Sequence, residues 1–395
     1  MVSFRAIVSK IVEMVINRTI KHKAVIVGSM IEESSVVSNK PFRVCAPGRV
    51  CLFGEHSDYL GLDVIPAAID LYIEIVAIPR DDDTIFVNYI DLDKTDEFPI
   101  DTLLAHRYER DYVRSAFNVV LDLNKPPTQG WDIRVSGNIP LAGGLSSSSA
   151  LTVASIITAG HMGGFDFNAS NIARLAYVAE VERFGESGGM MDHYASAFGG
   201  IIHVAMTSDQ RVTPLPAQIH GIVIGDSRMK KKDTVGDLKE IRKTVEAGYQ
   251  ELSNQHQGFN NRTTPLIDVL SRAQPNNAVR MAEGTLKNRD LTATAFQLLQ
   301  EKKPDEKYLG ELINQHHEIL RDYLFRSTPK IEKMIAASLE AGALGCKING
   351  SGGGGTMLAY APKREKEVAN AIEETGGTAY IVGIGKGASL TILGE

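Results

Sequence analysis

The chain has 395 residues and a net charge of −6 at pH 7, so it lacks the broad basic field that holds nucleic acid or an anionic membrane surface. Its three cysteines form no Cys-x-x-Cys pair, which argues against a disulfide framework and a structural zinc site. We therefore expect a small-molecule partner and a reducing, cytoplasmic location. At about 100 to 200 residues per domain, the length predicts two domains.

Residues 1–40 are expected to form an appendage to the folded protein. The segment 4–33, FRAIVSKIVEMVINRTIKHKAVIVGSMIEE, spaces its apolar residues partly at three and four and carries charges throughout. This pattern is typical of an amphipathic segment and differs from a signal peptide or a membrane span. No later segment approaches the roughly 18 uninterrupted apolar residues of a membrane helix, so no membrane partner is expected.

Strand-like and helix-like runs alternate between residues 41 and 215. Runs rich in β-branched residues predict strands over 42–54, 72–80, 83–90 and 131–139. Helical periodicity predicts helices over 149–162 and 169–185. The alternation indicates a first domain of mixed α and β structure.

A second domain, residues 216–395, is expected after a linker. The segment 208–218, SDQRVTPLPAQ, has a linker-like composition and places the boundary between about 208 and 220. A predicted strand over 221–226 precedes a long polar helical region from about 231 to 324. Further strands are predicted in GTMLAYAP and TAYIVGIG near the C-terminus.

The stretch 48–61, GRVCLFGEHSDYLG, gathers polar side chains at the end of the first predicted strand. Arg49, Glu55, His56 and Asp58 surround a glycine beside apolar residues. Such a cluster presents hydrogen-bond donors and acceptors together, as a binding site requires. A zinc site at His56 is disfavoured because no second His or Cys lies nearby at metal-ligand spacing.

The stretch 140–154, PLAGGLSSSSALTVA, leads two glycines and four serines into a helical pattern. Unsatisfied N–H groups and the dipole at a helix N-terminus favour a phosphate, and serine hydroxyls add donors or a magnesium ligand. A serine cap on a core helix is the alternative. No GxxxxGK[ST] motif is present, which disfavours a Walker A nucleotide fold.

Two further glycine-rich stretches have a functional and a structural interpretation each. In 349–360, NGSGGGGTMLAY, glycines allow the backbone to approach a ligand closely, although a hairpin turn has the same composition. In 185–200, GESGGMMDHYASAFGG, Asp192 follows a glycine turn at the start of an expected helix. It is a candidate catalytic residue or an N-terminal cap.

Three segments within these stretches, 47–59, 140–151 and 349–358, resemble, in order and approximate spacing, the three motifs of the GHMP small-molecule kinases. The segment 179–193, AEVERFGESGGMMDH, is similar without gaps to the galactokinase segment that carries a magnesium-binding glutamate and the catalytic aspartate. PGRVCLFGEHSDY is similar to the galactokinase signature, with Cys51 and Phe53 where that signature ordinarily has Asn and Ile. The resemblance runs from about residue 42 to the C-terminus. It implies a two-domain α/β (α+β) protein with a ribosomal-protein-S5-like N-terminal domain, an α/β sandwich C-terminal domain and an active site in the cleft between them.

The resemblance also implies roles for individual residues. Asp192 and Arg49 match catalytic positions, and the matches to sugar-binding positions are Glu55, His56, Asp58 and Tyr59. The matches to ATP-binding positions are Ala142, Gly143, Gly144, Leu145, Ser146, Ser147, Ser148, Gly352 and Gly353. Ser148 and Glu180 match Mg²⁺ ligands, with Glu182 as a competing candidate because mevalonate kinases have a Glu-Arg pair there.

The implied activity is that of an ATP-dependent sugar kinase. It would phosphorylate the anomeric hydroxyl of a galactose-like monosaccharide or a uronic acid, with Mg²⁺ as cofactor. Galactose itself is questioned by Leu238, which stands where galactokinases usually have a sugar-contacting tyrosine. The alternatives are a catalytically silent sugar and ATP sensor, or a mevalonate-type kinase of a non-sugar alcohol. The run 227–233, SRMKKKD, is either a phosphate contact or a solvated basic turn.

Overall fold

The computed structural model describes residues 39–140, 143–229, 234–270 and 276–394. Nearly all of the expected appendage, 1–40, lies outside the described residues. In the part of the chain that is described, no helix has the length and apolar character needed to cross a membrane.

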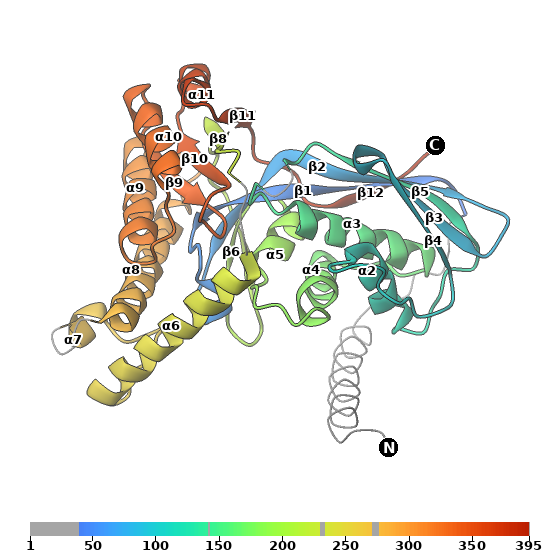
Figure 1. The fold of residues 1–395 in the computed structure, drawn as a ribbon, viewed down its shortest axis with the longest axis horizontal. Helices are drawn as coiled ribbons and strands as arrows, with labels where there is room; N and C mark the ends of the chain where they lie inside the picture. The colour runs from blue at the N-terminus through green and yellow to red at the C-terminus, as the bar shows by residue number, and fades with distance from the viewer. Residues whose placement is uncertain (1–38, 141–142, 230–233, 271–275, 395) are drawn as a thin grey trace.

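The first unit is a mixed sheet with helices packed on one face (Figure 1). Its main path runs β12-β1-β2-β5-β3-β4, and β6 joins β2 and β7. The strands are β1 (Phe42–Phe53), β2 (Ile65–Pro79), β3 (Thr84–Tyr89), β4 (Lys94–Pro99), β5 (Trp131–Gly137), β6 (Ile201–Val204), β7 (Val212–Leu215) and β12 (Ser389–Ile392). The covering helices are α2 (Tyr112–Leu121), α3 (Ser147–Met162), α4 (Ala169–Tyr177) and α5 (Met191–Phe198).

The second unit is a four-stranded antiparallel sheet with helices. Its order is β11-β8-β10-β9. The strands are β8 (Ile222–Asp226), β9 (Gly345–Asn349), β10 (Thr356–Tyr360) and β11 (Thr378–Val382). The helices are α6 (Thr234–Gln255), α7 (Leu266–Leu270), α8 (Asn277–Leu298), α9 (Glu306–Asp322), α10 (Pro329–Glu340) and α11 (Glu365–Glu374). The two α/β units confirm the expected fold class.

The two elements that lead to the site, β1 and α3, are largely buried. The first half of β1 alternates buried and exposed residues, but from Ala46 to Phe53 every residue is buried, because the second unit packs against this end of the strand. Helix α3 is buried around most of its circumference. Its hydroxyl groups at Thr152, Ser155 and Thr158 donate to carbonyls one turn earlier, so the polar side chains are satisfied inside the core.

Two features of the chain differ from its expected division at residue 215. The segment expected to be a linker contains β7, which pairs with β6 in the first sheet. The last strand, β12, pairs with the outer side of β1, so the range 216–395 includes a strand that completes the first sheet. The partner of β12 lies more than 300 residues earlier in the chain, so that pairing has no local sequence signal. β7 pairs with β6 just before it, but both strands have only four residues, and the proline and polar residues around β7 have the composition of a loop.

Candidate active site

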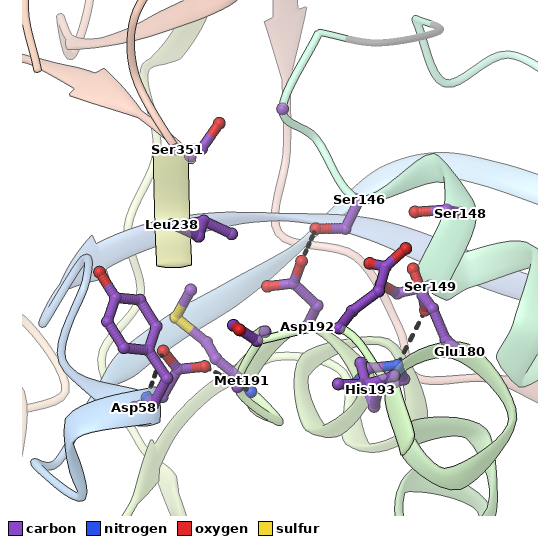
Figure 2. A pocket seen from close by; sticks show the side chains of 18 of the residues that line it. Asp58, Ser146, Ser148, Ser149, Glu180, Met191, Asp192, His193, Leu238 and Ser351 are labelled. Atoms are coloured by element: carbon purple, nitrogen blue, oxygen red, sulfur yellow. Dashed lines mark hydrogen bonds and ion pairs between the residues drawn. The ribbon is translucent and has the colours of Figure 1, made fainter. Parts of the chain in front are cut away.

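A cavity of about 640 Å³ lies where the end of β1, the serine-rich loop, the start of α5 and the second unit meet. Its lining comes from both units, with Leu238 and Ser351 contributed by the second (Figure 2). Of the catalytic and sugar-site residues expected from the sequence, all six line it: Arg49, Glu55, His56, Asp58, Tyr59 and Asp192. Folding therefore gathers the four sequence stretches into one site.

Arg49 and Asp192, which both line the cavity, form a two-pronged ion pair. Arg49 Nε donates to Asp192 Oδ1 at 2.6 Å, and Arg49 Nη2 donates to Oδ2 at 2.8 Å. The arginine outweighs burial and lowers the pKa of Asp192, while the pKa of Arg49 is raised by the carboxylate. Both groups are therefore charged at neutral pH.

Asp192 is not a helix cap. It is the second residue of α5, whose N-cap is Met190, with no side-chain capping bond. Its carboxylate instead accepts from Arg49 and from Ser146 Oγ at 2.5 Å, as Figure 2 shows for the serine. The alternative interpretation of Asp192 as a cap is therefore wrong.

The serine-rich loop has its carbonyl groups held from behind. Asn349 Nδ2 and Arg49 Nη1 donate to the Gly144 carbonyl, and Thr356 Oγ1 donates to that of Gly143. Ser146 adopts a left-handed backbone conformation (φ 60°) just before α3 begins. The N–H groups of a first helical turn lack intrahelical acceptors, and at the start of α3 they belong to serines that line the cavity. This arrangement suits an anion.

The expected phosphate-binding residues divide into those that line the cavity and those that support it. Gly144, Ser146, Ser147 and Ser148 line it, together with Ser149. Gly143 and Leu145 are not among the lining residues, and Leu145 is buried in the core. Ala142 and residues 230–233 of the basic run lie outside the described residues.

The glycine loop between β9 and β10 is a hairpin that also contributes to the site. Gly350 and Ser351 line the cavity, whereas Gly352 and Gly353 do not. At Gly352, where φ is +73°, an added Cβ would come within 2.6 Å of the Cβ of Arg326. These two glycines thus support the loop from behind, next to that arginine.

Glu55 lines the cavity, and the charge of its carboxylate is neutralised by a buried lysine. Its Oε2 accepts from Lys347 Nζ at 2.9 Å, and Lys347 also donates to the Cys51 carbonyl at 2.8 Å. The side chains of Glu55 and Lys347 are 3% and 0% exposed. A buried charge is tolerated only when it is paired and hydrogen-bonded, so the lysine holds Glu55 in place.

Asp58 is bound by backbone groups rather than by a cation. It accepts from the N–H groups of Met191 and Tyr59 at 3.2 and 2.9 Å. An added Cβ at Gly189 would come within 1.9 Å of Asp58 Oδ2, so only glycine fits there. Desolvation and the nearby charge of Asp192 raise the pKa of Asp58 to about 6.

His56 is placed by its aromatic neighbour. Its Nδ1 lies 2.7 Å from Tyr59 Oη, and the two rings meet edge to face. His56 has a φ of +63°, a conformation uncommon for a non-glycine residue and concentrated at functional sites.

Glu180 reaches the cavity through an irregular turn. A π-helical turn over Val178–Glu182 follows α4, and such turns are frequent at functional sites. Glu180 lines the cavity, and its Oε2 bonds His193 Nε2 at 2.8 Å. Glu182 is not among the lining residues. Figure 2 shows Glu180 beside Ser148 and Ser149.

Three residues of the site were not identified from the sequence. Lys347 lies on β9 just before the third glycine-rich motif, Asn349 is the first residue of that motif, and His193 follows Asp192. Asn349 links all three motifs, because its Oδ1 accepts from Cys51 N while its Nδ2 donates to Gly144. For Lys347, the only sequence signal was its position between the apolar residues Cys346 and Ile348.

Comparison with known proteins was made through family models and curated relatives. The models for the N-terminal and C-terminal domains of GHMP kinases match residues 111–200 and 295–378, and the galactokinase galactose-binding signature matches 34–79. The mevalonate kinase of Thermococcus sibiricus is 31% identical over 350 residues, covering 86% of this chain and 95% of its own length. The chain belongs to the GHMP kinase family.

This GHMP kinase is also similar to galactokinases. The galactokinase of Mannheimia succiniciproducens is 30% identical over 339 residues, covering 82% of this chain and 86% of its own length. The crystal structure of Lactococcus lactis galactokinase complexed with galactose superposes with a TM-score of 0.77 at 21% identity, covering 88% and 95% of the two chains. At that identity the likeness confirms the fold. GHMP kinases are ATP-dependent phosphotransferases, and ATP is therefore the co-substrate.

Proposed function

We propose that this GHMP kinase transfers the γ-phosphoryl group of ATP to the anomeric hydroxyl of a galactose-like monosaccharide or a uronic acid. The observation that carries the proposal is the position of Glu55, His56 and Asp58 beside the Arg49–Asp192 pair in one cavity. Acceptors and donors presented together suit the hydroxyl groups of a sugar. The match to the galactose-binding signature supports the same substrate class.

Asp192 is proposed to orient the attacking hydroxyl and to take its proton late. Both carboxylate oxygens already accept hydrogen bonds from Arg49, and Oδ2 accepts a third from Ser146. A carboxylate with a lowered pKa is a weak base, so early proton removal by Asp192 is unfavourable. A loose phosphoryl-transfer transition state does not require early deprotonation. Arg49 adds fixed positive charge where negative charge develops.

Ser148 and Glu180 are proposed to hold Mg²⁺. The residues described in the lining include six carboxylates and two arginines, and each arginine is in an ion pair. A polyphosphate bound there therefore needs further positive charge. A hydroxyl and a carboxylate are the hard oxygen donors that Mg²⁺ prefers. When bound, the ion would neutralise charge on the phosphate oxygens.

Two other functions remain as alternatives. A mevalonate-type kinase is favoured by the identity to the Thermococcus sibiricus protein. A silent sugar and ATP sensor is disfavoured by the Arg49–Asp192 pair, since a sensor has no need of a charged group positioned beside the acceptor.

The test is a coupled ADP-release screen over hexoses, pentoses, uronic acids and mevalonate. We expect turnover with at least one sugar. The ³¹P–¹H correlation spectrum of the product should show the phosphate coupled to the anomeric proton. Turnover with mevalonate alone would contradict the proposal, and binding of sugar and ATP without ADP release would favour the sensor.

A further inference from the structure

We propose that the acceptor is an uncharged deoxy sugar, which presents a carbon without a hydroxyl group to Leu238 and Met191. The inference rests on the proposed sugar kinase function and narrows its substrate class. It excludes uronic acids and mevalonate, and it disfavours fully hydroxylated hexoses. We call the part of the cavity lined by Glu55, Asp58 and Asp192 the acceptor side. Two of its properties support the inference: its negative charge, and an apolar wall formed by Leu238 and Met191.

The charge on the acceptor side opposes an anionic substrate. Three carboxylates line that side, at Glu55, Asp58 and Asp192. The cations that face them among the described residues are already bound, Lys347 to Glu55 and Arg49 to Asp192. A substrate carboxylate would therefore lie beside Asp58 with no uncommitted cation among the described lining residues, and like charges at close range repel.

The apolar wall is formed by two side chains from different units. Leu238 projects from the start of α6, and Met191 from the start of α5, into the part of the cavity that contains Asp58 (Figure 2). Neither side chain can accept or donate a conventional hydrogen bond. A hydroxyl placed against them loses its water and gains no partner, whereas a methyl or methylene group loses nothing.

Contacts made by the residue before Leu238 hold the start of α6 beside the cavity. The preceding residue, Asp237, accepts from Arg326 Nη2 at 3.0 Å, and Arg326 Nε donates to the Ser351 carbonyl at 3.1 Å. The Arg326 side chain is 13% exposed. The start of α6 is thereby tied to the glycine loop, which places Leu238 beside the cavity.

The experiment compares matched sugars on three proteins. For the best neutral hexose of the screen, kcat/KM is measured for that hexose, its singly deoxygenated forms and its uronic acid. The proteins are the full-length wild type, Leu238→Tyr and the control Leu238→Met. A hydrophobic pocket discriminates by about 10- to 200-fold per group, so we expect one deoxy sugar to exceed its parent by about tenfold in wild type.

The variants identify the side chain responsible. Leu238→Tyr supplies a hydroxyl partner, and we expect it to reverse the preference in favour of the parent hexose. Leu238→Met keeps an apolar side chain of similar volume and should retain the wild-type order.

The outcomes separate this inference from the function on which it rests. A uronic acid turned over faster than its neutral parent would overturn the charge argument. A kcat/KM at or below that of the parent hexose for every deoxy sugar in wild type would overturn the apolar wall. In both cases the sugar kinase assignment would stand. Turnover of mevalonate without turnover of any sugar would instead remove the proposed function.

Discussion

Two ion pairs in this protein join distant parts of the chain and have opposite relations to solvent. Arg49 and Asp192 are 143 residues apart, and their side chains are 6% and 26% exposed. Lys347 and Glu55 are 292 residues apart and are 0% and 3% exposed. The first pair faces the cavity with its carboxylate partly open, whereas the second is sealed beneath it.

This difference in solvent exposure indicates a catalytic role for the first pair and a structural role for the second. The Arg49–Asp192 pair can exchange contacts with a substrate, because its carboxylate keeps access to the cavity. A sealed pair cannot lose one member without leaving an unpaired buried charge. We therefore expect changes to Arg49–Asp192 to alter turnover and changes to Lys347–Glu55 to alter folding. The sequence interpretation gave Glu55 a purely substrate-binding role, which the buried lysine makes incomplete.

The largest expected effect comes from breaking the open pair with Asp192→Asn. The amide retains the shape but cannot accept two charged hydrogen bonds from Arg49 or place negative charge beside the acceptor. We expect kcat to fall by roughly 100-fold to 10,000-fold with acceptor binding little changed. Steady-state kinetics with saturating Mg²⁺, on protein shown to be folded by a thermal melt, would measure this. Turnover equal to wild type would remove Asp192 from the mechanism.

Breaking the sealed pair with Lys347→Met should destabilise the protein by about 3 to 5 kcal/mol, because Glu55 would remain buried without its partner. Chemical denaturation measures the change. The double variant Lys347→Met with Glu55→Gln removes both charges and should recover most of the lost stability. Lys307→Met, at an exposed position on α9, is the control and should change stability by less than about 0.5 kcal/mol. A tolerated Lys347→Met would show that the pair is not needed for folding.

Glu180 belongs to neither ion pair, and changing it tests the proposed metal site. Glu180→Gln should raise the Mg²⁺ concentration needed for half-maximal activity by about 10- to 100-fold, because an oxygen ligand loses its charge. Mg²⁺-dependent protection in a thermal melt with a non-hydrolysable ATP analogue gives a second readout. Glu182→Gln is the matched control, since Glu182 does not line the cavity. A larger effect at Glu182 would assign the metal to that residue.

The smallest expected effect concerns Asp58, whose pKa is raised to about 6. Above this pH the carboxylate is ionised and can accept hydrogen bonds from the hydroxyl groups of the proposed substrate, and below it the group becomes neutral. We expect kcat/KM for the acceptor to fall as the pH drops through about 6, by roughly 5- to 30-fold in total. Asp192 does not cause this loss, because its pKa is lowered. The acidic limb should disappear in Asp58→Asn, and its persistence would assign it to another group.

Much of the fold was predictable because its signals are local. The strand over 42–54 corresponds to β1 and the helix over 149–162 to α3, since apolar spacing reports burial of a single element. The long polar helical region is the series α6 to α9. Helix α2 and strands β4 and β6 were not predicted. Two further missed features, β7 in the expected linker and β12 beside β1, are four-residue edge strands recognised only by their pairing.

By itself, the sequence determined the chemistry available to this protein. The three motifs, their order and their residue types predicted a GHMP kinase. Loop glycines, serines and clustered carboxylates can be recognised by residue type and spacing without knowledge of the fold. Tertiary structure alone decided which charges meet: Arg49 with Asp192, and Glu55 with Lys347. It also decided that Gly350 and Ser351 line the cavity while Gly352 and Gly353 support it. These pairings join residues 143 and 292 positions apart, so they depend on the packing of distant elements rather than on any local pattern.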